Sequence, residues 1–442
     1  MRVMKWSMIA LAVAAAASTQ LAVAAPFVSD QAEAKGFVED SKLDLLVRNY
    51  YYNRNKTDGA TDDKDWTQGI QGMFSSGYTQ GLIGVGVEAW GQLAIKLDGS
   101  DKYAGTGNMS VDSDGEVNNS QGKAGAAAKF RISKTELKVG DMQPSTSPVF
   151  AVGGSRILHQ TASGIQLQSS EVKDLDLEGG HFYSATSQDS NARDGDLWAT
   201  YAGVKANSID YFGGKYGVTD NLSFSLYGAK LEDVWNQYYA NANYTLPLGG
   251  DQSLNFDGNY YNTKDTGNAK AGEISNNAYS LAAAFSFLKA HTLTLGFQKV
   301  NGDTPFDYIG VGKNNRGGDS IFLANSIQYS DFNAPGEKSV QARYDLKMAE
   351  YGVPGLSFMT RYVKGWDIDG TNTPAGSAYA GLYGADGKHH ETNVEVKYVV
   401  QSGPAKDLSF RIRQAWHSAN ADEGEGDISE FRLITDYPLN IL

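Results

Sequence analysis

Basic side chains recur on one face of the predicted β-strands. In the stretch LSFRIRQAW, residues 408–416, apolar residues alternate with a second set that includes Arg411 and Arg413. A strand directs alternate residues to opposite faces, so one face is apolar apart from Gln414 and the other carries the two arginines. Five further predicted strands repeat the pattern. The basic residues on the polar phase are Lys129, Arg131, Arg343, Arg361, Lys397, Arg411, Arg413 and Arg432.

Arginines in such a row suit one task, which is passing a carboxylate from one side chain to the next. A guanidinium stays charged and binds a carboxylate through two parallel hydrogen bonds. A basic ladder of this kind down one wall of a barrel would guide carboxylate-bearing solutes. The alternative is that any polar lumen needs some basic residues, and then the ladder implies no substrate.

The segment 302–337 is predicted to supply acids opposite this basic wall. It is too long for an ordinary connection between strands, and its apolar pieces PFDYIG and IFLANS are unusual for a solvent-exposed loop. We expect it to fold into the barrel as a constriction. Polar residues beside those pieces would then hold an ammonium or guanidinium group. They are Asp307, Tyr308, Asp319 and Ser320.

A second inward loop is predicted at residues 143–164. Its Pro, Gly and Ser residues allow tight folding, and four apolar side chains in it need burial: Val149, Phe150, Ile157 and Leu158. The alternative for both segments is a folded lid on the surface that caps the barrel.

A hydrolase is the competing hypothesis from a different functional class. A Ser/His/Asp set for peptide hydrolysis would consist of Ser320, His181 and Asp233. No G-x-S-x-G nucleophile elbow surrounds Ser320. His181 shares its phase with Leu175 and Leu177, which directs it to the apolar face.

A non-conducting barrel that serves as an adhesin or scaffold is a third hypothesis, although a purely structural barrel would pair its inward cations internally. The sequence indicates no metal site and no cofactor. His389 and His390 are adjacent, so on a strand they would project in opposite directions, as expected of surface histidines.

Alternating strands with long and short connections are the elements that must position these residues. A soluble sandwich would pack the apolar face on a core, whereas an outer-membrane barrel would turn it to lipid. Tyr and Trp gather at predicted strand ends, as an interfacial girdle requires. A closed barrel also leaves no sheet edge unpaired in hydrocarbon. We therefore expect an all-β transmembrane antiparallel barrel.

The chain length sets the size of this barrel. At about 23 residues per strand with its connection, it accommodates roughly eighteen strands. Residues 196–248 are ambiguous, and counting through them gives eighteen or nineteen strands. Single-chain bacterial barrels have even numbers, so we predict eighteen. A lumen that wide conducts water unless loops obstruct it.

The N-terminus and the composition agree with export to the bacterial outer membrane. Residues 1–24 have the basic start, the apolar run and the Ala22-Val23-Ala24 cleavage site of a signal peptide, which leaves one domain at 25–442. The chain has no Cys, and its formal net charge of −13 argues against nucleic acid as a partner. The expected partners are outer-membrane lipid and small solutes, with the chain a monomer or a trimer.

Long motifs carry a resemblance to a known family. They are FVSDQAEAKGFVEDSKLDLLVRNYYYNR, VFAVGGSRI, GGDSIFLANSIQYSDFNAPGEKS and DGKHHETNVEVKYVVQSGPAKDLSFRIRQAWH. Over essentially its full length the chain resembles the OprD family of substrate-specific outer-membrane porins.

The resemblance implies an eighteen-stranded barrel narrowed by its third and seventh loops. It also implies substrates that carry a carboxylate, among them basic amino acids and short peptides, with carbapenem antibiotics entering by mimicry. By position, the family's ladder falls on seven of the basic residues above, all except Lys129, and its loop-seven site on Asp307, Asp319 and Ser320. The outer loops 98–123 and 366–386 depart from the family pattern.

Overall fold

The computed structural model describes residues 26–57, 59–98 and 104–442. The signal peptide predicted at 1–24 lies outside the described residues. Among the residues described, no helix has the length and apolar character needed to cross a bilayer. In the described part of the chain the helical turns are two short 3-10 segments, η1 (Gln31–Glu33) and η3 (Met348–Tyr351).

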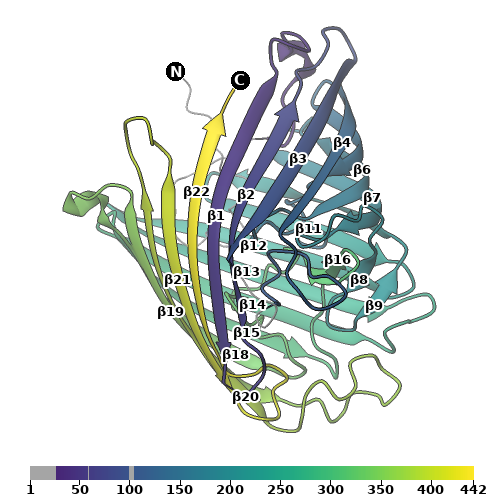
Figure 1. Cartoon of the computed structure of the whole chain (residues 1–442), viewed down its shortest axis with the longest axis vertical. Coiled ribbons are helices and arrows are strands. Elements are labelled where there is room, and N and C mark those ends of the chain that lie inside the picture. The colour runs from purple at the N-terminus through teal and green to yellow at the C-terminus, as the bar shows by residue number, and fades with distance from the viewer. Residues whose placement is uncertain (1–25, 58, 99–103) are drawn as a thin grey trace.

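Eighteen antiparallel strands form one closed sheet, because the first strand pairs with both the second and the last (Figure 1). This confirms the predicted fold class and strand number. The strands are β1 (Lys42–Lys56), β2 (Asp63–Ser75), β3 (Gly84–Asp98), β4 (Ser120–Ile132), β5 (Thr135–Met142), β6 (Thr161–Ser169), β7 (Leu175–Thr186), β10 (Ile209–Thr219), β11 (Leu222–Leu231), β12 (Trp235–Gly249), β13 (Gln252–Asp265), β14 (Ser275–Phe287), β15 (His291–Asn301), β18 (Lys338–Lys347), β19 (Leu356–Ile368), β20 (Gly387–Val399), β21 (Ser409–Ala419) and β22 (Ile428–Asn440).

A second, four-stranded sheet explains why residues 196–248 gave an uncertain strand count. It joins β8 (Leu197–Ala199) and β9 (Val204–Ala206) to β16 (Ile309–Val311) and β17 (Arg316–Gly317). These short strands belong to the connections 187–208 and 302–337 and not to the barrel wall. The chain thus holds two long connections against each other by backbone hydrogen bonds.

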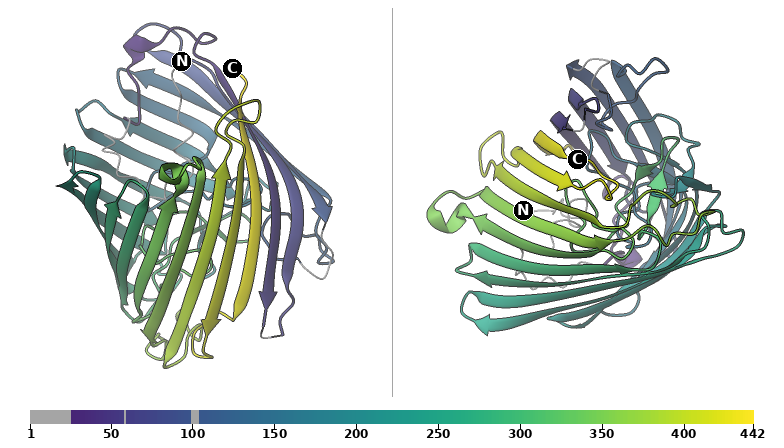
Figure 2. Two further views of the ribbon diagram at one scale, coloured as in Figure 1. Left: turned by 90° about the vertical axis from the view of Figure 1, so that its left-hand side faces the viewer. Right: turned by 90° about the horizontal axis from the view of Figure 1, so that it is seen from below.

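Short and long connections alternate along the chain, so that the short ones lie at one end of the barrel and the long ones at the other. Turns such as 133–134 and 288–290 close one end, whereas the long segments 143–160 and 302–337 leave the strands at the other. Figure 2, in the view from below, shows segments that cross the interior of the ring of strands. Two of them are the predicted inward loops, although β6 begins at Thr161, so the first ends four residues earlier than the predicted boundary at 164.

Apolar side chains of these loops pack against one part of the inner wall. Phe150 lies 4.7 Å from Phe182 of β7, and Phe306 lies 4.6 Å from Tyr261 of β13, both measured between ring centroids. These contacts belong to one buried cluster, here called the inner apolar cluster. Its members from the two predicted loops are Val149, Phe150, Val152, Phe306, Ile309, Val311 and Leu323.

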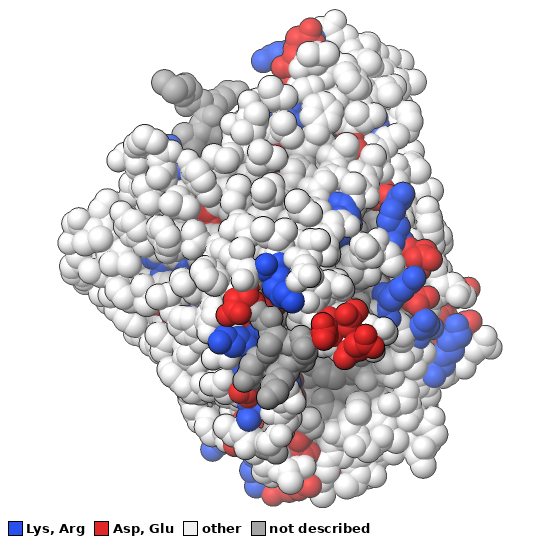
Figure 3. Space-filling view, in the orientation of Figure 1, with Lys and Arg blue, Asp and Glu red and all other residues white. Residues whose placement is uncertain are grey.

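The outer wall has the opposite character. Large apolar side chains on the outward phase of many strands remain exposed, among them Leu226, Leu281 and Leu295. On the face in Figure 3, charged side chains gather toward the lower end, where the long connections lie, and most of the wall above is free of them. An apolar belt of this kind is what a bilayer requires of a barrel.

We expect a charge in this belt to destabilise the protein according to its depth. Leu281 is at the middle of β14 and is 59% exposed, so Leu281→Arg should lower the free energy of unfolding by about 2–4 kcal/mol. The matched control is Leu288→Arg in the turn 288–290, where the same change should cost about 0–1 kcal/mol. Equilibrium urea unfolding in lipid vesicles measures both, and equal costs would contradict the assigned membrane belt.

Candidate functional site

The basic residues of β18–β22 meet one another across neighbouring strands. Arg343 of β18 is directly opposite Arg361 of β19. Arg413 of β21 is likewise opposite Arg432 of β22. Like charges in such positions repel, so the arrangement requires compensating groups nearby.

Acidic residues on the same strands supply most of that compensation. Glu395 of β20 is 2.7 Å from Arg411 Nη2 and 3.1 Å from Arg413 Nε. Arg343 forms a 2.7 Å ion pair with Asp345, a residue of its own strand. The basic ladder is therefore interleaved with carboxylates, which the sequence prediction did not include.

The remaining ladder residues of this wall have varied partners. Arg361 donates to the Asn393 side-chain oxygen from Nε and Nη2, at 3.0 and 2.8 Å, and Arg432 donates to Glu430 at 2.6 Å. Lys397, opposite Arg411, makes no hydrogen bond or ion pair with the residues that the structure describes.

Lys129 and Arg131 stand apart from this wall. Both are on β4, which β1, β2 and β3 separate from β22. Arg131 donates to Gln31 and Ser29 of the N-terminal segment at 3.0 and 2.6 Å. These two residues are therefore anchored at the end of the barrel that carries the short turns, away from the inward loops.

Sequence reasoning missed three further arginines that extend the basic surface. Arg54 of β1 pairs with Glu430 at 2.7 Å, and Arg156 and Arg316 come from the two inward loops. The sequence did not indicate that Arg54 faces the lumen. In the alternation of β1 it shares a face with Tyr50 and Tyr52, and these aromatic residues suggest an apolar face. The closure of β1 onto β22 was the signal that could have found it.

These three guanidinium groups line a cavity of about 240 Å³. Tyr308 forms another part of its boundary, and amide and hydroxyl groups of loop 143–160 and of two other connections complete the polar lining. The other polar residues that line the cavity are Thr106, Ser155, Gln160 and Gln188. A cavity with this lining offers donors to a carboxylate and, through Tyr308, a link to the acids of loop 302–337.

Asp307, predicted as an acid of the constriction, is a structural group in this fold. It is 3% exposed, and its carboxylate accepts hydrogen bonds from the N–H groups of Tyr201, Ala202 and Tyr308 and from the Tyr379 hydroxyl, at 2.7–3.0 Å. Burial raises its pKa to about 6, although the donated hydrogen bonds oppose the shift. All its acceptor positions are occupied because it holds three connections together, so no carboxylate oxygen remains for a solute.

The other predicted constriction residues differ in their access to the lumen. Asp319 is exposed and Tyr308 is half-buried. The Tyr308 hydroxyl donates to Asp331 at 3.0 Å, and the Tyr201 hydroxyl donates to the same carboxylate at 2.9 Å. Asp331 is half-buried and is an acid that the sequence prediction missed. Burial raises the pKa of Asp331 above its ordinary value.

The structure does not bring the alternative hydrolase residues together. His181 is exposed on the outer side of β7 and pairs with Asp210 at 2.8 Å. Asp233 accepts from the Asn268 N–H in a neighbouring connection. Ser320 is fully buried inside the barrel, with the wall between it and His181.

Comparison with known proteins agrees with this geometry. Residues 35–441 match the OprD family, described as outer membrane porin. The chain is 64% identical to Porin D of Pseudomonas aeruginosa over 448 residues, which cover all of both chains. It is 35% identical over 422 residues to Porin-like protein GalP of Pseudomonas putida, covering 93% of this chain and 95% of that one.

Solved structures give the same result. A crystal structure of Pseudomonas aeruginosa OprD superposes with a TM-score of 0.84 at 61% identity, covering 95% of this chain and all of that one. A structure of Pseudomonas aeruginosa OpdK with vanillate has a TM-score of 0.82 at 33% identity and covers 92% of this chain and all of that one. The predicted resemblance, fold and outer-membrane location are confirmed, and this chain belongs to the OprD family of outer membrane porins.

Proposed function

We propose that this porin conducts basic amino acids and short peptides that contain them, and that carbapenem-type antibiotics use the same path by mimicry. The observation that carries the proposal is the cavity of about 240 Å³ that Arg54, Arg156, Arg316 and Tyr308 share. Its arginines suit the carboxylate of a solute. The acids nearby, Asp319 and Asp331, suit a positively charged side chain.

Two-ended recognition follows from the chemistry of the groups. Arginine binds a carboxylate through parallel charge-assisted hydrogen bonds, which are stronger than neutral ones. A guanidinium or ammonium group is held in turn by carboxylates. A solute with one charge only would therefore lose half of its contacts. The vanillate in the related OpdK structure carries a carboxylate, which is compatible with the basic half of this scheme.

The basic ladder would deliver the solute by exchange of partners. Arg411 is about a third exposed, with 34% of its side chain accessible. Arg413 is more enclosed, with 11% of its side chain accessible and its Nε 3.1 Å from Glu395. A passing carboxylate can contact the exposed part of Arg411 while Glu395 keeps both guanidinium groups in position. Conduction needs sites that attract a solute and also release it, and a partly paired, partly exposed arginine meets both requirements.

Transport, and not hydrolysis or a purely structural role, is the activity that this scheme predicts. Unpaired cations in the lumen would argue against a non-conducting barrel. Most of the arginines are paired with carboxylates inside the barrel, which weakens that argument. The exposure of Arg411 supports that argument again, because a purely structural ion pair does not need a guanidinium group that solutes can reach. Burial of Ser320 away from His181 leaves the hydrolase hypothesis without a site.

Single-channel recording with arginine, agmatine and glutamate tests two-ended recognition. Agmatine is arginine without its carboxylate, so it lacks the group that the arginines would bind. Hydrogen bonds to charged groups contribute about 1.5–3 kcal/mol, so arginine blockades should last roughly ten times longer than those of agmatine or glutamate. Equal blockades by arginine and agmatine would remove the basic half of the proposal.

A variant of the acidic half completes that experiment. Asp319→Asn should shorten blockades by arginine and agmatine and leave those by glutamate unchanged or longer. The matched control is Asp251→Asn in the turn 250–251, at the opposite end of the barrel, which should change none of them.

The basic ladder is tested by the double substitution of Arg411 and Arg413 with Ala. Arginine uptake into vesicles should fall at least tenfold, because two charge-assisted contacts of about 1.5–3 kcal/mol each are lost along the path. The control replaces Lys289 and Lys406, two exposed lysines in the short turns 288–290 and 400–408, with Ala, which removes the same charge. Uptake that is unchanged in the first variant would refute the ladder.

Glu395→Gln should make the channel more selective for anions. Its loss leaves Arg411 and Arg413 without their shared counter-charge. A unit charge about 10 Å away in water changes an ion's energy by about 0.4 kcal/mol, which is about a twofold change in local ion concentration. The reversal potential in a KCl gradient measures this shift, with Glu350→Gln in η3 as the control. A shift toward cation selectivity would contradict the assigned pairing.

A further inference from the structure

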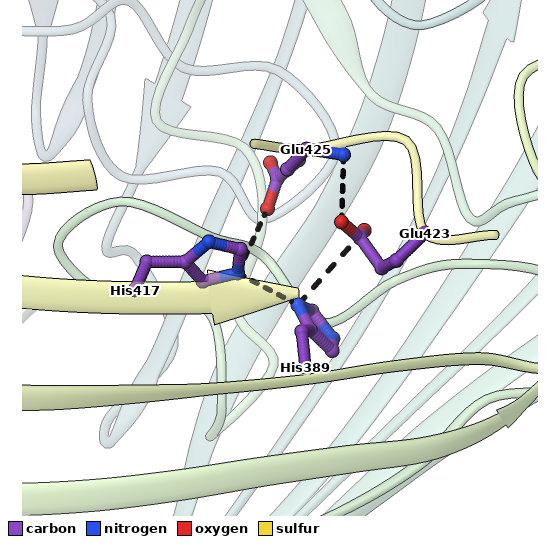
Figure 4. Close-up of side chains that lie close together, drawn as sticks. All are labelled: His389, His417, Glu423 and Glu425. Atoms are coloured by element: carbon purple, nitrogen blue, oxygen red, sulfur yellow. Dashed lines mark hydrogen bonds and ion pairs between the residues drawn. The ribbon is translucent and has the colours of Figure 1, made fainter. Parts of the chain in front are cut away.

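Two histidines and two glutamates converge at the end of the barrel that carries the long connections. His389 is at the start of β20 and His417 is near the end of β21. Glu423 and Glu425 come from the connection 420–427 that follows β21 (Figure 4). The expectation of surface histidines is thus wrong for His389, which is 3% exposed, because the register of β20 on β21 brings it to His417.

The potential ligand atoms of this group lie close together. His389 Nδ1 is 2.9 Å from His417 Nε2. Glu423 Oε1 is 3.9 Å from His389 Nδ1, and Glu425 Oε2 is 3.7 Å from His417 Nε2. One atom from each of the four side chains can be chosen so that all lie within 4.8 Å of one another.

The outer nitrogen of each imidazole ring already has a hydrogen-bond partner. His389 Nε2 is 2.7 Å from the Glu337 carboxylate, and His417 Nδ1 is 3.0 Å from the Gly426 carbonyl oxygen. The Gly426 carbonyl can only accept, so His417 Nδ1 carries the N–H group. An ionised Glu337 likewise requires the N–H group of His389 on Nε2. With Glu337 ionised and both rings neutral, the facing atoms, His389 Nδ1 and His417 Nε2, both carry lone pairs.

Two nitrogen lone pairs 2.9 Å apart repel unless a positive species lies between or beside them. A second observation also indicates a missing ligand: Glu425 Oε2, which faces His417, is buried and has no hydrogen-bond partner among the described residues. Ring packing holds the histidines in place. The ring centroid of Phe332 is 4.1 Å from that of His389, and Tyr329 is 4.9 Å from His417.

We propose that His389, His417, Glu423 and Glu425 form a binding site for a divalent transition-metal cation of the zinc type. Two imidazole nitrogens and two carboxylate oxygens suit zinc, whereas calcium and magnesium prefer oxygen ligands throughout. Tetrahedral zinc separates its ligand atoms by about 3.3 Å. The three spacings given above, 2.9, 3.7 and 3.9 Å, lie on either side of that value.

The surroundings have the features of a metal centre beyond its ligands. A metal-binding histidine usually donates its other N–H to a carboxylate or a carbonyl, which fixes the tautomer and orients the ring. Glu337 and Gly426 fill these roles here. Because Glu337 belongs to loop 302–337, a bound cation would join that inward loop, the connection 420–427 and two wall strands.

Metal binding to the purified full chain in detergent tests the site. After treatment with a chelator, the protein should bind one zinc ion per chain by calorimetry and by elemental analysis. Zinc should also raise the melting temperature by several degrees, because the ion binds the folded state alone. His389→Gln and His417→Gln should each abolish both effects. His390→Gln is the matched control, since it alters the neighbouring exposed histidine and should change neither.

The same measurements can overturn the proposal. If the wild-type protein binds no zinc, the imidazole rings of His389 and His417 share only a proton and the proposal is refuted. Equal zinc binding by wild type and His417→Gln would place the metal elsewhere, and preference for calcium or magnesium would exclude a zinc-type site. If a histidine variant fails to fold, Glu425→Gln decides the question. Its loss of zinc affinity supports the site, and unchanged affinity refutes it.

Discussion

The structure depends on one constraint, which is that no backbone hydrogen-bonding group can remain unpaired in hydrocarbon. Pairing of β1 with β22 meets this constraint by closing the sheet. Closure then gives each strand two environments. The outward phase must be apolar, as with Leu281, and the inward phase encloses a space wide enough for water. The inward loops, the inner apolar cluster and the basic ladder all occupy that enclosed space.

Charge in the lumen is arranged by compensation and not by simple accumulation. The register of β18–β22 puts arginines opposite arginines, and carboxylates such as Glu395 lie between them. Complete neutralisation would leave a solute nothing to bind, and no neutralisation would destabilise the wall. The observed state is between these limits, because one carboxylate, Glu395, pairs with both Arg411 and Arg413, and Arg411 stays about a third exposed.

Local sequence patterns predicted the strands and the face to which each side chain points. The contacts between side chains on different strands depend on long-range register, which those patterns do not contain. Alternation gave the strands and the inward phase of Arg411, because the period of two is a property of the strand itself. It could not reveal that Glu395 faces Arg413 or that His389 meets His417, because both contacts depend on how β20 aligns with β21. Asp307 illustrates a different limit. Its carboxylate accepts hydrogen bonds from three connections that are far apart in the sequence. A residue expected to face the lumen is therefore buried among those connections.

The inner apolar cluster explains why the arginine-lined cavity lies beside the basic wall. The loops attach to β7 and β10–β15 through aromatic residues such as Phe182 and Tyr261, so that part of the lumen is filled. Loop 143–160 also reaches the opposite side, where Ile157 and Leu158 pack against Tyr50 and Tyr52 of β1. It therefore spans the barrel and narrows it. A cavity at this level is lined by Arg54, Arg156 and Arg316, so a solute that enters it meets guanidinium groups.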